Sequence, residues 1–198
     1  RQMCIRDSYQ THMDVIAKSI PSDYNPTIDE FVDLLLNCKG KIFFTGVGKN
    51  GHVAAKATST FSSIGLPCFF INPVDSVHGD MGVINKGDIL VAISKSGNTE
   101  ELIHFLKHVE HKNCKIVSIH SNKNNKSLEY SSMDIDLKVR MEADHLNIVP
   151  TCSIAVFTVF LQSVACEISQ RKELTLEQFV KNHPGGSIGK VLDEEEIL

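Results

Sequence analysis

Five short runs of apolar, β-favouring residues are spread along the 198-residue chain and constrain its fold more than any other feature. Within each run the apolar residues are nearly continuous, as they are in strands that are covered on both faces. The segments between most of the runs place apolar residues at three- and four-residue intervals, which is typical of amphipathic helices. This order predicts an α/β fold, a three-layer α/β/α sandwich with a five-stranded parallel sheet. The predicted strands are 41–45, 67–71, 88–93, 115–120 and 134–139.

The same spacing predicts five helices, one of which is strongly apolar. They are expected over residues 26–37, 50–64, 100–110, 150–170 and 174–180. The apolar stretch 154–166 is interrupted by Thr158, Gln162 and Ser163, and it is shorter than the roughly 20 residues that cross a bilayer. We therefore expect a core helix there and no membrane partner.

The size and charge of the chain limit its partners. With 42% hydrophobic residues the chain can bury a substantial core, and we predict a single domain over residues 9–198. A formal net charge of −4 argues against nucleic acid, which needs a basic surface. The six cysteines lack C-x-x-C spacing, which favours reduced core thiols in a cytoplasmic protein. Residues 1–8 resemble translated adapter sequence, so we expect a non-native leader there.

A segment rich in hydroxyl groups follows the third predicted strand. Residues 94–99 read Ser-Lys-Ser-Gly-Asn-Thr and precede a helix that begins near Glu100. The first N–H groups of a helix lack backbone partners and have partial positive charge, so this junction is suited to an anion. We predict a phosphate site there, with helix capping alone as the other interpretation. Its candidate residues are Ser94, Ser96, Gly97, Asn98 and Thr99.

A glycine-rich turn follows the first predicted strand. Gly46, Gly48 and Lys49 lie in the pattern G-x-G-K-x-G, in which glycines allow close backbone approach and the lysine supplies a cation. The pattern lacks the Walker A spacing and the third glycine of a dinucleotide fingerprint. A tight turn also needs glycine for steric reasons alone. Because ligands bind beyond the carboxyl ends of parallel strands, we expect this turn and residues 94–99 to surround one small phosphorylated ligand.

Four motifs in this order resemble the sugar isomerase (SIS) domain, and more narrowly the D-arabinose 5-phosphate isomerases of the KpsF/GutQ-like group. They are G-x-G-K-N-G at 46–51, His-Gly-Asp at 78–80, S-x-S-G-x-T-x-E at 94–101, and His-Pro-Gly-Gly at 183–186. The similarity extends from about residue 25 to about residue 189. The resemblance implies a five-stranded parallel sheet flanked by helices, in agreement with the pattern of runs.

The resemblance also implies an activity. Such isomerases interconvert D-ribulose 5-phosphate and D-arabinose 5-phosphate, which feeds synthesis of the lipopolysaccharide sugar Kdo. Moving a carbonyl between C1 and C2 passes through an enediol(ate) and requires a base and a polarising group. The family's catalytic residues match Lys49, Glu101, Glu142 and His183. We expect His183 and Glu142 to transfer protons, Glu101 to support them, and Lys49 to stabilise the negative charge.

Each of these residues has a structural alternative. Lys49 can be a solvated turn lysine, and Glu101 a first-turn glutamate stabilised by the helix dipole. Glu142 can be a surface acid, and His183 a histidine that is favourable at a helix end. His78 matches a family histidine that contacts substrate, or it is an ordinary loop histidine.

The chain departs from the family pattern at two places. The family's E-A-C-P-L-G-x-x-P-T-S-S appears at 142–153 as Glu-Ala-Asp-His-Leu-Asn-Ile-Val-Pro-Thr-Cys-Ser, so we expect a reshaped loop around Glu142 and a changed sugar preference. Thr151 is expected to cap the following helix. Asn72 replaces a histidine that relatives associate with inhibitory zinc, so we expect neither a metal site nor a cofactor. Many relatives continue into paired CBS domains, so the chain is either a short form or truncated.

The resemblance implies a homo-oligomer, typically a tetramer, in which late residues such as His183 reach a neighbouring subunit's site. Two other functions stay open at this point. One is a non-catalytic SIS module that senses a sugar phosphate, although SIS regulators usually also have a DNA-binding domain. The other is an isomerase of a different sugar phosphate, such as a hexulose or sedoheptulose phosphate.

Overall fold

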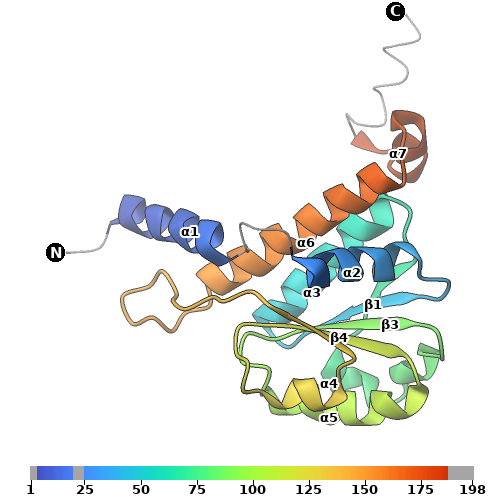
Figure 1. The fold of residues 1–198 in the computed structure, drawn as a ribbon, viewed down its shortest axis with the longest axis horizontal. Helices are drawn as coiled ribbons and strands as arrows, with labels where there is room; N and C mark the ends of the chain where they lie inside the picture. Colours follow the sequence, from blue (N-terminus) through green and yellow to red (C-terminus); the bar gives the residue numbers. More distant parts are fainter. Residues whose placement is uncertain (1–3, 20–24, 187–198) are drawn as a thin grey trace, which may run out of the picture.

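All five predicted strands form, and they make one parallel sheet in the order β2-β1-β3-β4-β5. The structure is a computed structural model that describes residues 4–19 and 25–186 (Figure 1). The fold class predicted from the sequence is thus confirmed. The strands are β1 (Ile42–Thr45), β2 (Cys68–Phe70), β3 (Ile89–Ile93), β4 (Lys115–His120) and β5 (Met133–Asp136).

Strand β5 is shorter than predicted, because the chain turns after Asp136. Lys138 has a positive φ of 43°, which a strand does not accommodate. The Asp136 carboxylate accepts the backbone N–H of Lys138 at 3.1 Å and closes this turn. Leu137 still donates its N–H to the carbonyl of His120 on β4 at 2.9 Å, and the chain leaves the sheet after it, although Leu137 and Val139 remain buried.

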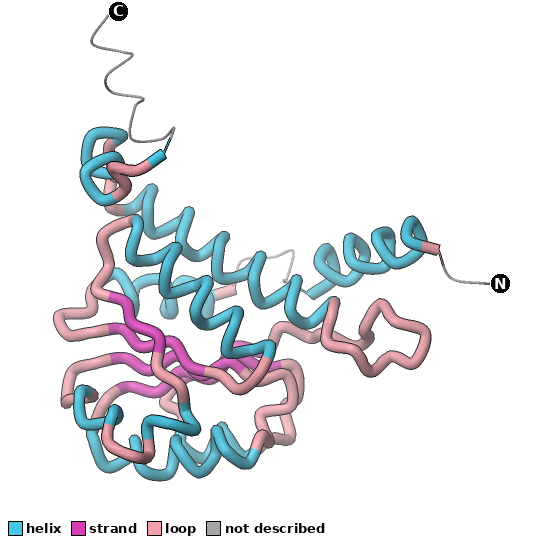
Figure 2. Tube along the Cα trace, turned by 180° about the vertical axis from the view of Figure 1, so that it is seen from behind, coloured by secondary structure: helices cyan, strands magenta, loops and turns pink. Residues whose placement is uncertain are grey.

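Both faces of the sheet are covered, which explains the continuous apolar runs. On β1, Phe44 packs in one apolar core and its neighbour Phe43 in the other, because successive side chains point to opposite faces. Val91 and Leu90 on β3 are divided in the same way. Figure 2 shows the strands between two helical layers.

The helical layers differ in size. Helices α2 (Pro26–Leu36), α3 (Lys49–Ser63) and α6 (Cys152–Arg171) cover one face, and α1 (Ile5–Ser19) packs on α6 (Figure 1). The short α4 (Pro73–Ser76) and α5 (Glu100–Val109) lie on the other face. Helix α7 (Leu176–Asn182) follows the carboxyl end of α6. Three 3₁₀ segments complete the described elements, at Asp80–Val83, Glu110–Lys112 and Lys126–Tyr130.

Helix α1 was not predicted, and residues 5–8 of the expected leader form its first turn. It buries only Val15 and Ser19, so its sequence lacks the broad apolar stripe that indicates a packed helix. The five helices that the sequence predicted all form, and their ends lie within two residues of the predicted ones.

Helix α6 is the core helix that the sequence predicted. It is the one helix in the described part of the chain that is long and apolar enough to cross a membrane, yet half of that segment is buried inside the protein. Phe160 stacks on Phe31 of α2 with the ring centroids 6.2 Å apart. At its carboxyl end, Arg171 pairs with Asp29 at 2.7 Å and Asp33 at 2.9 Å. Its apolar surface thus packs within the protein.

The prediction that the cysteines lie in the core holds for only some of them. Cys68 and Cys152 are buried, whereas Cys4 and Cys166 are exposed. All six are free thiols, and burial raises the pKa of the Cys68 thiol to about 12.

Candidate functional site

The glycine-rich turn after β1 is shaped by two different constraints. Gly46 is buried, and a Cβ atom there would lie 2.8 Å from the carbonyl carbon of Asn50 and 3.0 Å from the carbonyl oxygen of Ile93. Gly48 has open space but a φ of 58°, which favours glycine. The steric interpretation of this motif therefore accounts for Gly46. Gly46 of this turn approaches Ile93 at the end of β3, and Lys49 is exposed at the start of α3.

Residues 94–99, called here the anion seat, form a compact turn between β3 and α5. The buried Ser94 hydroxyl accepts the N–H of Gly97 at 3.1 Å and lies 3.2 Å from the hydroxyl oxygen of Thr99. Thr99 occupies the N-cap position of α5 but makes no side-chain cap hydrogen bond. Helix capping alone thus does not explain Thr99, and the first turn of α5 keeps N–H groups that can face an anion.

A second loop, residues 122–127, fixes the shape of the anion seat. The side-chain oxygen of Asn98 accepts the N–H of Lys126 at 2.9 Å. The side chain of Asn125 packs directly against Gly97, whose φ is 66°, and leaves no room for a Cβ atom there. The seat is therefore held before any ligand binds, which lowers the entropic cost of positioning one.

A cavity of about 830 Å³ runs beside α5 and contains three of the predicted site residues. Asn98 comes from the anion seat, Glu101 from the first turn of α5, and His78 from the loop after α4. His78 and Glu101 are both exposed, so their side chains can reach a ligand in this cavity.

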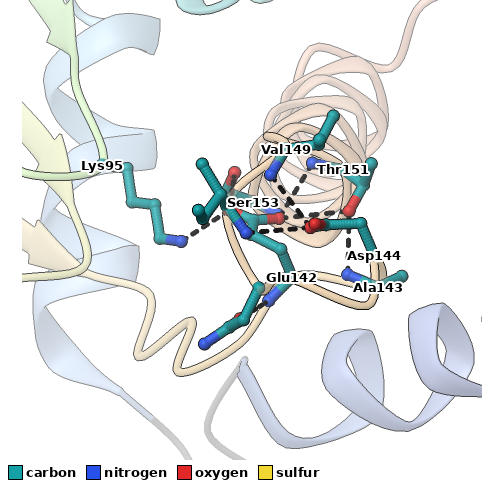
Figure 3. A network of polar contacts seen from close by, with 9 residues as sticks. Lys95, Glu142, Ala143, Asp144, Val149, Thr151 and Ser153 are labelled. Carbon is teal, nitrogen blue, oxygen red and sulfur yellow. Dashed lines mark hydrogen bonds and ion pairs between the residues drawn. The ribbon is translucent and has the colours of Figure 1, made fainter.

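Glu142 is buried, so its interpretation as a surface acid is wrong. Its carboxylate lies at the amino end of α6 and is surrounded by hydrogen-bond donors (Figure 3). Oε1 accepts Lys95 Nζ at 2.5 Å and Ser153 Oγ at 2.6 Å, and Oε2 accepts the backbone N–H groups of Thr151 at 2.8 Å and Ser153 at 3.1 Å. The carboxylate thus replaces the missing backbone partners of the first helical turn.

These donors determine the charge of Glu142. Burial by itself raises the pKa of the carboxyl group, but the hydrogen bonds from Lys95, Ser153 and Thr151 outweigh it and lower the pKa from 4.5 to about 2. A carboxylate with this pKa takes up a proton poorly at neutral pH. The geometry thus favours a fixed negative charge at Glu142, while its predicted part in proton transfer stays a prediction.

Thr151 has the position expected of it but not the expected bond. It is the N-cap residue of α6, yet its side chain makes no cap hydrogen bond. Its hydroxyl oxygen instead accepts the N–H of Ala143 at 2.9 Å. Glu142 takes over the capping and Thr151 fastens the preceding loop.

The residues that depart from the family pattern are the ones that hold this loop. Asn147 takes the place of a glycine and has a φ of 57°, and asparagine tolerates this left-handed conformation better than most residues. The Asp144 carboxylate accepts the N–H groups of Ile148 and Val149 at 2.9 Å each and that of Leu146 at 3.0 Å. Asp144 and Asn147 thus hold the loop together with Thr151.

His183 lies apart from the other predicted catalytic residues of the same chain. It follows α7 and stacks on Phe179 with ring centroids 5.8 Å apart. Its neighbour Asn182 donates to the carbonyl of Ser63, at the end of α3 opposite Lys49. At 1.5 Å per residue these two ends of α3 are about 21 Å apart. Figure 1 shows α7 at the far end of α6.

Sequence reasoning missed two residues that organise the site. Lys95 was visible inside the anion-seat motif, but nothing in the pattern indicated that its side chain reaches Glu142. Ser153 stands where a helix begins, and its hydroxyl group was the available signal. Asn72, which replaces the zinc-associated histidine, accepts the N–H of Val74 and caps α4. Within residues 4–19 and 25–186 no group of three or more side chains is arranged to hold a metal ion.

This arrangement of the strand ends matches a known family model. The model of the SIS domain matches residues 35–167, which include β1 to β5, the anion seat and Glu142. The chain belongs to the SIS domain family. A solved structure with the same fold, Escherichia coli CFT073 c3406 in complex with arabinose 5-phosphate, is 30% identical to this SIS domain, with a TM-score of 0.87, and the match covers 91% of this chain and 95% of that one.

Two curated relatives are named arabinose 5-phosphate isomerase KdsD. The protein from Pseudomonas aeruginosa is 36% identical over 175 residues, which is 86% of this chain and 54% of that protein. The protein from Francisella tularensis is 36% identical over 162 residues, 81% of this chain and 50% of that protein. The chain thus spans about half the length of the curated relatives it matches.

More distant structures share the fold alone. The sugar isomerase domain of the RpiR transcription factor from Sphaerobacter thermophilus is 11% identical, with a TM-score of 0.75, and both chains are covered completely. The likeness therefore extends to regulators without indicating a regulatory role here.

Proposed function

We propose that this SIS domain is an aldose-ketose isomerase that interconverts D-ribulose 5-phosphate and D-arabinose 5-phosphate through an enediol(ate). Curated relatives at 36% identity have the name of this activity, and a relative of nearly the same length was solved with arabinose 5-phosphate. The observation on which the proposal rests is the prearranged anion seat beside a buried, ionised carboxylate. The seat suits the phosphate at one end of a linear sugar, which leaves the carbonyl end free to reach the acid and base groups.

The residues of the proposed site have separate tasks. Ser94, Ser96 and Thr99, with the first N–H groups of α5, bind the phosphate and fix the sugar. Lys49 stabilises the negative charge that develops on the enediolate oxygens. Glu101 and His78 contact the sugar from the cavity beside α5. The reaction shifts a proton between C2 and C1, and needs neither a cofactor nor a metal ion.

The proton carrier in this proposal is His183, supplied by a neighbouring subunit. The low pKa of Glu142 makes that residue a poor carrier, whereas an imidazole ring can both accept and donate a proton. In its own subunit His183 lies about one length of α3 from Lys49, so the four predicted catalytic residues meet only between chains of a homo-oligomer, such as a tetramer.

Exposed apolar side chains provide surfaces for such an assembly. On α1 they are Tyr9 and Met13, and on the loop before α6 they are Leu146, Ile148 and Val149. Both segments project from the same side of the molecule (Figures 1 and 2). Exposed apolar surface of this kind favours contact with another protein surface.

In this proposal the reaction takes place in the cytoplasm, where it supplies D-arabinose 5-phosphate for Kdo and lipopolysaccharide synthesis. A direct test is to incubate the purified protein with D-ribulose 5-phosphate and to follow D-arabinose 5-phosphate by NMR. Exchange of the transferred proton with D₂O would report the enediol(ate). Binding of both sugars without turnover would contradict the proposal and favour a sensor. Turnover only of a hexulose or sedoheptulose phosphate would favour another isomerase.

A further inference from the structure

Lys95 belongs to the anion seat by its backbone but points away from it. Its side chain crosses to the segment that follows β5, where Nζ lies 2.5 Å from Glu142 Oε1 (Figure 3). Strand β4 separates β3 from β5 in the sheet. Within the part of the chain that the structure describes, this ion pair is the only hydrogen bond or ion pair between residues 94–99 and residues 140–153. Lys95 thus links the predicted phosphate site to the segment with Glu142.

The two side chains of this ion pair are buried to different extents. The side chain of Glu142 is 1% exposed and that of Lys95 is 36% exposed. The other donors to the Glu142 carboxylate are neutral groups of Thr151 and Ser153. Loss of the ammonium group would leave a buried carboxylate without a counter-charge, which is strongly unfavourable. The positive charge of Lys95 is therefore committed to Glu142 and is not free for a phosphate.

We propose that Lys95 is a positioning residue that acts through Glu142, and that it is not a phosphate ligand. It fixes the carboxylate on the amino end of α6 and keeps the Glu142 segment in register with the anion seat. The distance between the bound phosphate of the substrate and the reacting groups then stays constant. This inference rests on the proposed isomerase function.

The two possible roles of Lys95 predict opposite kinetic changes. If Lys95 acts through Glu142, Lys95→Met lowers kcat at least about tenfold and leaves KM for D-arabinose 5-phosphate within about twofold. If Lys95 binds the phosphate, the same variant raises KM about tenfold or more with kcat little changed. The second pattern would overturn the inference. Lys86→Met, in the exposed turn before β3 at the opposite edge of the sheet, is the matched control and should leave both constants unchanged.

A double-mutant cycle with Glu142→Gln tests whether the effect passes through Glu142. Glutamine keeps the shape and one of the two acceptor oxygens but has no charge to balance. Lys95→Met should then change kcat less than about threefold in the Glu142→Gln background, because coupled residues are not additive. An equal loss in both backgrounds would contradict the inference. Lys95→Arg keeps the charge and should recover kcat to within about threefold of the unmodified protein. A Lys95→Arg variant with a kcat as low as that of Lys95→Met would also contradict the inference.

Folding is checked by thermal unfolding of every variant. If Lys95→Met alone does not fold, the double variant with Glu142→Gln is expected to fold, since no uncompensated charge remains; failure of both would contradict the inference. If the unmodified protein shows no turnover, the proposed function fails by itself. The inference is then judged by calorimetry with D-arabinose 5-phosphate, whose Kd should stay within about twofold in Lys95→Met. A tenfold weaker Kd would overturn it.

Discussion

The side-chain oxygen of Asn147 accepts the backbone N–H of Glu142 at 2.6 Å, while Asn147 itself has a φ of 57°. One residue thus closes the loop with its backbone and anchors the buried acid with its side chain. A glycine satisfies the first requirement but not the second, because it has no side chain to accept the N–H.

Substitutions of Asn147 therefore separate the contribution of its left-handed backbone conformation from that of its side-chain hydrogen bond. Asn147→Gly should lower the free energy of unfolding by about 1 kcal/mol, since it removes one hydrogen bond. Asn147→Ala should cost about 1 to 2 kcal/mol more, because alanine is also strained at this φ. Urea denaturation of the three proteins measures the difference. Equal stability of the Gly and Ala variants would show that the left-handed conformation is not retained.

The low pKa of Glu142 predicts how stability changes in acid. A group with a folded pKa of about 2 and an ordinary pKa of 4.5 stabilises the fold above pH 4.5 and loses this contribution as the pH falls toward 2. Between pH 6 and pH 3 the protein should lose about 2 kcal/mol more stability than Glu142→Gln does. Urea denaturation at the two pH values measures this, and parallel losses would mean that Glu142 has an ordinary pKa.

Ser153 should contribute more than an ordinary helix serine. Its hydroxyl donates to the Glu142 carboxylate at 2.6 Å and is buried. Ser153→Ala should cost about 1.5 to 3 kcal/mol, as expected for a hydrogen bond to a charged group. Ser163→Ala on the same helix is the control, because that exposed hydroxyl bonds only the carbonyl of Val159. Similar melting temperatures for the two variants would contradict the assigned role.

Thr99 tests the phosphate assignment. Thr99→Val keeps the shape of the side chain and removes the hydroxyl near Ser94. It should raise KM for the sugar phosphate about tenfold and change kcat less than about threefold. Steady-state kinetics beside the control Thr58→Val, in the middle of α3, measures both constants. An unchanged KM would remove the Thr99 hydroxyl from the site.

His183 and Lys49 provide a test of a site shared between subunits. Each of the variants His183→Ala and Lys49→Ala should lower turnover by orders of magnitude. When the two are co-expressed, up to about a quarter of the sites in random hetero-oligomers combine an intact Lys49 with an intact His183 from a neighbour. Recovered activity near this fraction is therefore expected. Complete absence of recovery, with mixed oligomers shown by mass spectrometry, would place both residues in one chain.

The sheet was predictable because each strand has its own signal in the sequence, independent of its partners. Runs such as Ile89–Ile93 are short, apolar throughout and rich in β-favouring residues, which is typical of a strand covered on both faces. The end of β5 was not predictable, because the turn at Lys138 depends on a local hydrogen bond. The backbone N–H of Lys138 donates to the side-chain carboxylate of Asp136. Helix α1 gave a weak signal because it buries little of its surface.

The motifs pointed to segments that follow strands of the sheet, but they gave no information on the contacts between those segments. In the structure the anion seat follows β3, and Glu142 lies in the segment between β5 and α6. The pairing of Lys95 with Glu142 joins positions 47 residues apart, and a single sequence contains no signal of that distance. The burial of Glu142 was missed for the same reason, because its donors come from Lys95 and from the backbone and side chains of Thr151 and Ser153, at the start of a helix that begins ten residues later.

The carboxylate of Glu142 caps the amino end of α6, the longest helix of the core, and is also linked to the anion seat through Lys95. A change at position 142 therefore alters the support of α6 together with any chemistry, so the two properties cannot vary independently there. The exposed side chains of His145, Leu146, Ile148 and Val149 do not combine two roles in this way. Substitutions at these exposed positions can therefore change the tip of the loop without disturbing the acid at its base.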